Sequence, residues 1–296
     1  MEPFVIIPPA RIAVIGLGNM GLPMSACLAK AGFDVVGFDV SKDARERYAK
    51  AGLAVAPDAG SAVGKAAVVI TLLPNGKIVR AAIDGLRPAL RAGTVVIDMS
   101  SSEPMGTRAL GEELIAAGFA FIDAPVSGGV RRAVDGTLAV MAGGDDKTID
   151  RVTRVLAAMG RNIFRTGPLG SGHAVKALNN YVSAAGLAAT VEALAVAKRF
   201  GVDPGTFADV LNASSGRNNT TELKLKQFII PESYTSGFSL ALMAKDIRTA
   251  DALARELGVP MPLGERVTQL WNEAEEKVGG AMDHTAFNEY IADLKR

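Results

Sequence analysis

The sequence has very few of the residues that form disulfides and metal sites. Cys27 is its single cysteine, and its two histidines lie far apart along the chain. One thiol cannot form a disulfide within the chain, so we expect a reducing, cytoplasmic environment. No group of cysteines, histidines and acids has the spacing of a metal site, so the sequence offers no obvious metal centre.

An excess of charge of one sign is also lacking, because 32 lysines and arginines balance 31 acids at a net charge of +1. This balance gives no electrostatic reason to expect binding to nucleic acid or to an anionic membrane. Residues 1–11 contain an acid and three prolines and lack a basic start, so we expect no signal peptide. The one long apolar segment, after residue 176, carries Glu192 and Lys198 and is interpreted as a core helix rather than a membrane span.

The length predicts two domains, because a single core stops growing at roughly 250–300 residues and the chain has 296. The first half alternates short apolar strands with helical stretches, which is the pattern of a parallel sheet covered by helices on both faces. The expected strands are 11–18, 34–39, 66–74, 94–100, 119–125, 137–144 and 162–168.

Strand patterns stop after Gly172, and residues 173–200 predict a single helix on the order of 40 Å long. Further helical stretches follow toward the C-terminus. We therefore predict a doubly wound α/β domain in residues 1–170 and an all-helical domain in residues 171–296, with the long helix between them.

A glycine-rich turn with the spacing G-x-G-x-x-G follows the first predicted strand. Gly16 permits the tight turn, Gly18 lets a pyrophosphate approach the backbone, and Gly21 lets the next helix pack on the strand. The N-terminus of that helix then offers unpaired N–H groups to phosphates. The cofactor-binding residues predicted in this turn are Gly16, Leu17, Gly18, Asn19, Met20 and Gly21.

Asp39 ends the next predicted strand, 18 residues after Gly21, where NAD sites have the acid that binds ribose hydroxyls. A carboxylate there would repel the 2′-phosphate of NADP, so we expect NAD as cofactor, with NADP less favoured. The alternative is a glycine turn of some other doubly wound sheet, with Asp39 a surface residue at a strand end.

Two later loops are expected to border the nicotinamide ribose, because ligands lie outside the carboxyl ends of parallel strands. They are residues 72–75 and residues 98–104. The cofactor contacts predicted in them are Leu73, Pro74, Asn75 and Ser101. Serine is a good helix N-cap, so at least one of the three serines 100–102 is expected to cap the helix that follows.

Lys176 and Asn180 are four residues apart and share one face of the predicted long helix. A lysine partly removed from water has a lowered proton affinity and can exchange a proton near neutral pH. Lys176 is therefore the candidate general acid and base, and Asn180 would bind the reacting oxygen or orient the lysine. The alternative is a lysine whose head lies in solvent. His173 is the competing proton carrier and is interpreted as a bystander near the helix start.

The turn Ser127-Gly128-Gly129 follows the fifth predicted strand. Glycines accept positive φ, so this turn can direct several backbone N–H groups into one concavity that suits a carboxylate. The alternative is an ordinary tight turn. Arg131 and Arg132 come next and either bind a second anionic or polyhydroxy group or point to solvent.

Four blocks of the sequence together resemble the β-hydroxyacid dehydrogenases, which include 3-hydroxyisobutyrate dehydrogenase and tartronate semialdehyde reductase. The blocks are GLGNMG, DAPVSGGVRRAVDGTLAVMAGG, GSGHAVKALNN and FSLALMAKD, and the resemblance runs from Arg11 to about Leu294. It implies a Rossmann-type domain, a long interdomain helix, a homodimer or homotetramer formed through the helical domain, and no metal.

The same resemblance implies roles for individual residues. It makes Lys176 the catalytic acid and base and Asn180 a substrate-binding residue. It implies that residues 127–129 hold the carboxylate of a small hydroxy acid. Lys245, in the last of the four blocks, would lie near the cofactor and close the site.

The expected activity is the NAD-dependent interconversion of a small β-hydroxyacid, such as 3-hydroxyisobutyrate, and its semialdehyde or oxo acid. The segment 211–222, which contains Arg217, resembles the corresponding segment of 3-hydroxyisobutyrate dehydrogenases and could reach the site from the helical domain. Alternatives are a tartronate semialdehyde reductase and a dehydrogenase of serine or polyhydroxy acids. An imine reductase and a non-catalytic NAD-binding scaffold are less favoured, because Lys176 is present. About 125 residues after the boundary are too few for 6-phosphogluconate dehydrogenase. His284 lies in a polar stretch and is expected to be solvated.

Overall fold

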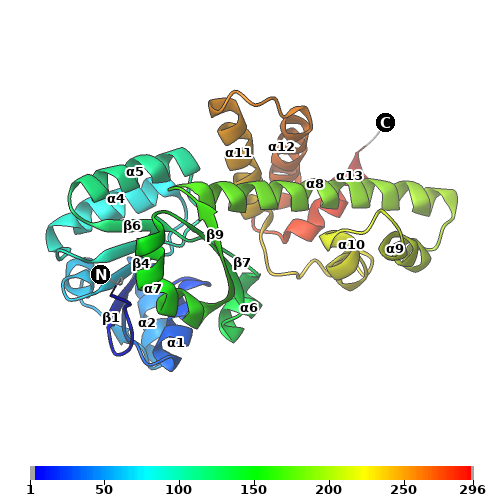
Figure 1. Ribbon diagram of the computed structural model, residues 1–296. Helices are drawn as coiled ribbons and strands as arrows, with labels where there is room; N and C mark the ends of the chain where they lie inside the picture. The colour runs from blue at the N-terminus through cyan, green and yellow to red at the C-terminus, as the bar shows by residue number, and fades with distance from the viewer. Residues whose placement is uncertain (1–3, 295–296) are drawn as a thin grey trace. The chain divides into compact units, whose positions relative to one another are not determined.

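The computed structural model describes residues 4–294 and contains two compact units, which meet within one helix between Lys176 and Ala177. The sequence-based boundary at residue 170 lies just before the start of that helix. Figure 1 follows the chain through the sheet of the first unit and the helices of the second.

The first unit is built on a sheet with the strand order β3-β2-β1-β4-β5-β6-β8-β7, and β9 pairs with β8. Neighbouring strands from β3 to β6 are parallel, whereas β8 is antiparallel to both β6 and β7 and parallel to β9. The strands are β1 (Arg11–Ile15), β2 (Asp34–Phe38), β3 (Ala54–Val55), β4 (Val68–Thr71), β5 (Val95–Asp98), β6 (Ala120–Asp123), β7 (Val126–Ser127), β8 (Leu138–Gly143) and β9 (Gly160–Gly167).

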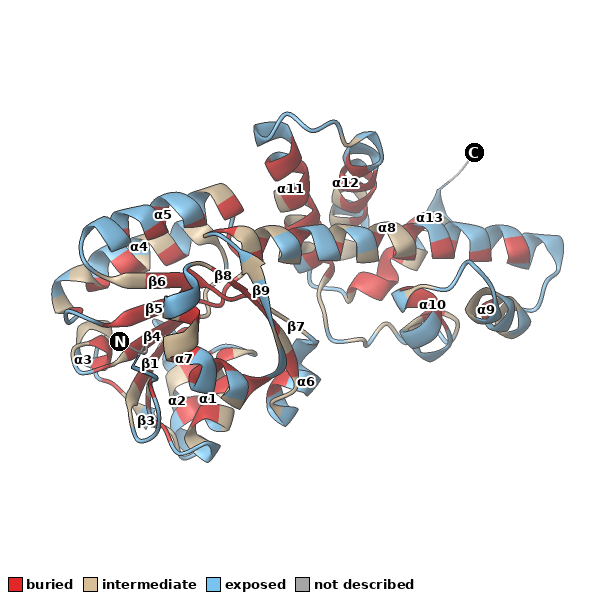
Figure 2. Ribbon diagram, in the orientation of Figure 1, coloured by how far each residue is buried: buried red, intermediate tan, exposed pale blue. Residues whose placement is uncertain are grey.

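Both faces of this sheet are buried, because successive residues of a strand point to opposite sides. In β1, Ile12 and Val14 belong to one apolar core while Ala13 and Ile15 belong to the other. Figure 2 shows the central strands β4, β5 and β6 as largely buried, whereas β9 is mostly exposed. The helices of this unit are α1 (Gly21–Lys30), α2 (Lys42–Lys50), α3 (Ala59–Val63), α4 (Gly76–Leu86), α5 (Pro104–Ala116), α6 (Gly129–Asp135) and α7 (Asp146–Met159). The predicted doubly wound sheet is confirmed.

The second unit is all-helical in its described residues, as predicted. Its core is built around Trp271, which stacks on Phe287 with a ring-centroid distance of 4.5 Å. Leu187 and Val191 of the long helix are fully buried in the same core. The helices are α8 (Ser171–Phe200), α9 (Pro204–Ala213), α10 (Asn219–Leu223), α11 (Leu240–Glu256), α12 (Pro262–Ala274) and α13 (Phe287–Asp293).

Helix α8 has 30 residues, and its length and composition would allow it to cross a membrane. Its most apolar window is 44% buried inside the protein, however, and Leu194 continues the buried stripe of Leu187 and Val191. One such helix is weak support for a membrane span. Its packing supports the interpretation as a core helix.

The elements absent from the sequence prediction are the shortest ones. Strands β3 and β7 have two residues each and helix α3 has five. Such segments contain less than one repeat of an apolar pattern, so periodicity cannot detect them. The antiparallel direction of β8 was not predicted either, because it depends on the pairing with β7.

The expectation that His284 is solvated is wrong. The residue is 3% exposed, and its Nδ1 lies 3.1 Å from the carbonyl oxygen of Phe238. The polar residues around it turn inward, because the Asp283 carboxylate accepts hydrogen bonds from Ser236 and from the backbone N–H of Gly237. Burial, together with the nearby positive charge of Lys224, lowers the pKa of His284 to about 4.

We predict that His284 makes the protein sensitive to acid. Its pKa is lower in the folded state than in the unfolded chain, so its contribution to stability is complete above about pH 6.5 and is lost as the pH falls toward about 4. Its share of that loss should be on the order of 2 kcal/mol at pH 5. Urea unfolding of wild type and His284→Gln at pH 7 and pH 5 measures it. An equal loss in both proteins would contradict the assignment.

Candidate active site

The glycine turn between β1 and α1 contains three glycines. Two of them are required by close packing, and the third faces open space. A Cβ at Gly16 would lie 2.2 Å from the carbonyl oxygen of Leu72, and one at Gly21 would lie 2.0 Å from that of Gly16. Neither space can accept a side chain. A Cβ at Gly18 would meet nothing within 4 Å. The open space over Gly18 and the uncapped N-terminus of α1 fit an approaching pyrophosphate.

Asp39 lies against this turn. One of its carboxylate oxygens accepts a hydrogen bond of 2.7 Å from the N–H of Leu17, and the other accepts one of 2.8 Å from the N–H of Ser41. These two bonds hold the acid at the end of β2. The residue therefore has a fixed position beside the turn rather than a free one at the surface.

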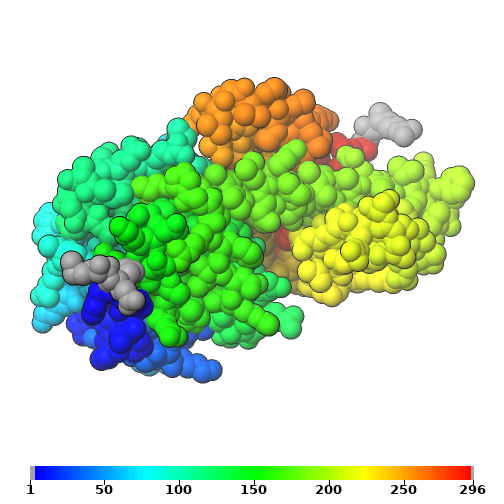
Figure 3. Space-filling model, in the orientation of Figure 1, coloured from blue at the N-terminus to red at the C-terminus, as the bar shows by residue number. Residues whose placement is uncertain are grey.

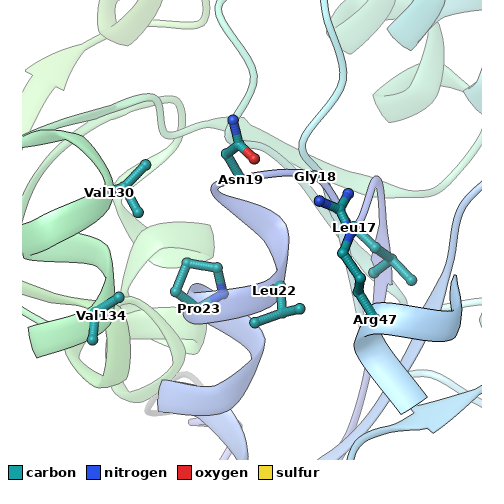
Figure 4. Close-up of a pocket in the computed structure, with 8 residues that line it drawn as sticks. All are labelled: Leu17, Gly18, Asn19, Leu22, Pro23, Arg47, Val130 and Val134. Carbon is teal, nitrogen blue, oxygen red and sulfur yellow. The ribbon is translucent and has the colours of Figure 1, made fainter. Parts of the chain in front are cut away.

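Arg47 is a residue of this region that the sequence analysis missed. It extends from α2 toward Leu17 and Gly18 and lines a pocket of about 230 Å³ together with Asn19 and Val130 (Figure 4). A guanidinium beside a glycine turn can bind phosphate oxygens. The sequence contains no pattern that singles out Arg47, because an arginine on a polar helix such as α2 is expected to point to solvent.

The loops after β4 and β5 are joined to each other. The N–H of Leu73 donates to Ser100 Oγ at 2.9 Å, and the side chain of Asn75 accepts from the N–H of Ile78 and so caps α4. Ser102 donates to the buried carboxylate of Asp98 at 2.7 Å. The first unit therefore brings the two predicted cofactor loops together at one edge of the sheet.

The expectation that one of the three serines caps the next helix is wrong. Helix α5 has Glu103 as its N-cap residue, makes no side-chain capping bond and begins with Pro104. Proline has no N–H and is preorganised for the first helical position, so the need for a side-chain cap is reduced. Ser100 and Ser102 are used instead to tie the loops and strand ends together.

The turn at residues 127–129 has the backbone conformation expected of it. Gly128 has a φ of 133° and Gly129 a φ of 67°, values that favour glycine. Ser127 is half-buried and both glycines are exposed. Arg131 and Arg132 are exposed as well, and Arg132 lies along Gly128. The turn is therefore open to a ligand.

His173 is buried and bonded on all sides. Its ring Nδ1 lies 2.9 Å from Thr107 Oγ1, and its ring Nε2 lies 3.2 Å from the carbonyl oxygen of Ser100. Its backbone N–H donates to the Asp123 carboxylate at 2.9 Å. Burial raises the pKa of Asp123. A ring with both nitrogens engaged and no exposure cannot serve as a proton carrier for a substrate, which supports its interpretation as a bystander.

Lys176 and Asn180 lie in one continuous helix, α8, where Lys176 is half-buried and Asn180 is 6% exposed. The Asn180 Nδ2 donates to Asp246 at 2.6 Å. The Lys245 ammonium lies 3.3 Å from the other oxygen of Asp246. Asp246 therefore holds two of the predicted site residues together in the second unit.

The sequence analysis missed Asp246, although a signal for it exists. Along α11 the residues Met243, Ala244, Ile247 and Ala250 are buried, and Asp246 falls in the same helical stripe. An acid on the apolar face of a helix needs a partner. That mismatch could have identified it next to Lys245.

No cluster of three or more possible metal ligands occurs within residues 4–294. Arg217, the other candidate contact, is exposed and lies 3.6 Å from the carboxylate of Glu222. It is therefore paired locally at the surface of the second unit.

Two family models match the chain over almost its whole length. The NAD binding domain of 6-phosphogluconate dehydrogenase matches residues 11–167, and the NAD-binding domain of NADP-dependent 3-hydroxyisobutyrate dehydrogenase matches residues 170–291. The chain is also 32% identical to 2-(hydroxymethyl)glutarate dehydrogenase of Eubacterium barkeri, over 93% of both chains. The chain belongs to the β-hydroxyacid dehydrogenase family that includes 3-hydroxyisobutyrate dehydrogenase.

Other members of the family are equally similar. The NAD-dependent L-serine dehydrogenase of Pseudomonas aeruginosa is 35% identical over 88% of this chain and 91% of its own. The structure of Mycobacterium tuberculosis 3-hydroxyisobutyrate dehydrogenase with L-serine has a TM-score of 0.90 and 34% identity, and covers 97% of this chain and 99% of its own. The protein is a hydroxyacid dehydrogenase that uses a nicotinamide dinucleotide.

The glycine turn of this dehydrogenase allows a paired test. We predict that Gly18→Ala folds normally, with a melting temperature within about 2 °C of wild type, because its Cβ meets no atom. It should raise the KM for the dinucleotide about tenfold or more by obstructing phosphate binding. Gly21→Ala should instead lower the melting temperature, because its Cβ meets the Gly16 carbonyl. Thermal melting and steady-state kinetics of both variants test this. Wild-type KM in Gly18→Ala would refute the role of the turn.

Proposed function

We propose that the protein oxidises the hydroxymethyl group of a small β-hydroxyacid of the 3-hydroxyisobutyrate type with NAD, and reduces the corresponding semialdehyde. The observation that carries this proposal is the spacing of Lys176 and Asn180 on α8 in a chain whose glycine turn fits a dinucleotide. The bound nicotinamide would supply hydride transfer. The protein must then move one proton and hold the acid in place.

Lys176 acts as the general acid and base in this proposal. It takes the hydroxyl proton as the alcohol is oxidised and returns it in the reverse reaction. Asn180 binds the reacting oxygen. One of its two amide N–H bonds is committed to Asp246, which leaves the other for the substrate. The fixed amide orientation supports this role.

The turn at residues 127–129 binds the substrate carboxylate through backbone N–H groups. The positive φ values of Gly128 and Gly129 support this role, because they let successive N–H groups converge. Lys245, held by Asp246, lies near the cofactor and closes the site. Leu73, Pro74, Asn75 and Ser101 border the cofactor.

The names of the relatives point to a common substrate core. 3-Hydroxyisobutyrate, L-serine and 2-(hydroxymethyl)glutarate all contain a hydroxymethyl group on the carbon next to a carboxylate. They differ only in the third substituent of that carbon, which is a methyl, an amino or a carboxyethyl group. We propose that this chain acts on the same core, and that the surroundings of the third substituent decide its substrate.

We predict that Lys176→Ala lowers turnover by roughly 10²–10⁴-fold, the range of general acid–base catalysis, while the dinucleotide still binds. Turnover with 3-hydroxyisobutyrate and dinucleotide affinity by fluorescence titration are measured separately. Lys198→Ala is the control, because it removes an exposed lysine from the same helix. A loss of less than about tenfold would exclude the role. If His173→Gln abolished turnover without lowering stability, the proton transfer would belong to that residue.

NAD should be preferred over NADP. Asp39 is held beside the glycine turn by Leu17 and Ser41, where its charge would bind ribose hydroxyls and repel a 2′-phosphate. Asp39→Ala should therefore lower kcat/KM for NAD. The ratio of kcat/KM for NAD to that for NADP should fall by about tenfold or more. Steady-state kinetics with both cofactors provide the test. Equal use of both by the wild-type enzyme would disprove it.

A further inference from the structure

Lys224 is a lysine with an unusual environment in the helical unit. It is the C-cap residue of α10, between the buried side chains of Thr221 and Leu225. Its ammonium lies 3.5 Å from Ser183 Oγ of α8. Burial lowers its pKa to about 8, with the carboxylate of Asp283 partly opposing the shift. The side chain is therefore still largely protonated at pH 7.

This cation has no counter-ion within residues 4–294, because no carboxylate lies within 4.0 Å of it. Asp283 is committed elsewhere, since it accepts hydrogen bonds from Ser236, Gly237 and Thr285. His284 is kept neutral at pH 7 and has no negative charge to offer. Burying a cation without a partner is costly, so such a group is a candidate for binding an anionic ligand.

The contact with Ser183 places this ammonium on a particular face of α8. Lys176, Asn180 and Ser183 follow one another at intervals of four and three residues, which is a single stripe of a helix. Ser183 lies about 4.5 Å along the axis from Asn180, the length of a short carbon chain. Figure 3 shows the segment that includes α9 and α10, in yellow, packed beside the green α8.

We propose that Lys224 binds a second carboxylate on the substrate. A substrate whose reacting oxygen is bound by Asn180 would extend its third substituent along α8 to Ser183 and Lys224. The substrate class is then a dicarboxylic acid with a hydroxymethyl group next to one carboxylate and the second carboxylate a few bonds away. This inference rests on the proposed function, because it takes Asn180 to bind the reacting oxygen.

A pair of substrates tests the inference in the full-length enzyme. The measured quantity is the ratio of kcat/KM for 2-(hydroxymethyl)glutarate to that for 3-hydroxyisobutyrate, which differ in the third substituent. In wild type this ratio should exceed one. Lys224→Met keeps the apolar stem and removes the charge, so the ratio should fall at least about tenfold, mainly through KM for the dicarboxylic acid. Lys224→Arg, which keeps the positive charge, should retain most of the wild-type ratio.

Lys226→Met is the matched control. Lys226 lies two residues after Lys224, is exposed and is paired with Asp209. It should leave the ratio at the wild-type value. A second measurement compares two substrates within each protein, so a difference in the amount of folded enzyme cancels. The amide of the distal carboxylate should be a poorer substrate than the free diacid for wild type by at least about tenfold, and the two should be nearly equal for Lys224→Met.

The outcomes separate this inference from the proposed function. If wild type oxidises 3-hydroxyisobutyrate but has a ratio below one, or if Lys224→Met leaves the ratio unchanged, the second-carboxylate site is excluded and the hydroxyacid function stands. If wild type oxidises neither acid, nor serine, the proposed substrate core is wrong and the inference fails with it.

Discussion

The position of the start of helix α8 depends on the hydrogen bonds that the buried carboxylate of Asp123 accepts. Asp123 lies at the end of β6 and accepts hydrogen bonds from the N–H groups of Gly170, at 2.8 Å, and His173, at 2.9 Å. Gly170 immediately precedes α8 and His173 lies in its first turn, where the N–H groups lack partners within the helix. One strand end thereby fixes the first turn of the helix that carries Lys176 one turn later.

The same constraint explains the glycines before that lysine. A Cβ at Gly172 would lie 2.2 Å from the carbonyl oxygen of Met141, and one at Gly170 would lie 2.6 Å from that of Pro104. The helix start packs directly on backbone at both positions. His173 completes the arrangement by bonding to Thr107 and Ser100. The segment is therefore glycine-rich because it is closely packed, and its histidine stabilises this packing.

One buried acid of the second unit contacts two of the predicted site residues. Asn180 and Lys245 are joined through Asp246, which orients the Asn180 amide and the Lys245 ammonium. Lys224, at the C-terminal end of α10, lies 3.5 Å from Ser183 of α8, and no carboxylate of the described residues lies within 4.0 Å of its ammonium. In the proposed function, the paired groups would bind the reacting end of the substrate and Lys224 would bind its second carboxylate.

The sequence by itself determined the doubly wound sheet, the all-helical second unit, the long helix and the glycine turn, because each depends on local periodicity or on glycine geometry. Only the tertiary structure decided the roles of residues whose partners are distant in the chain. Ser100 and Ser102 were predicted as helix caps but form hydrogen bonds that connect loops and strand ends. His284 was predicted to be solvated but is buried. Asp246 and Lys224 became significant for the same reason: burial and the identity of a charge's neighbours are set by packing between helices, which no local pattern records.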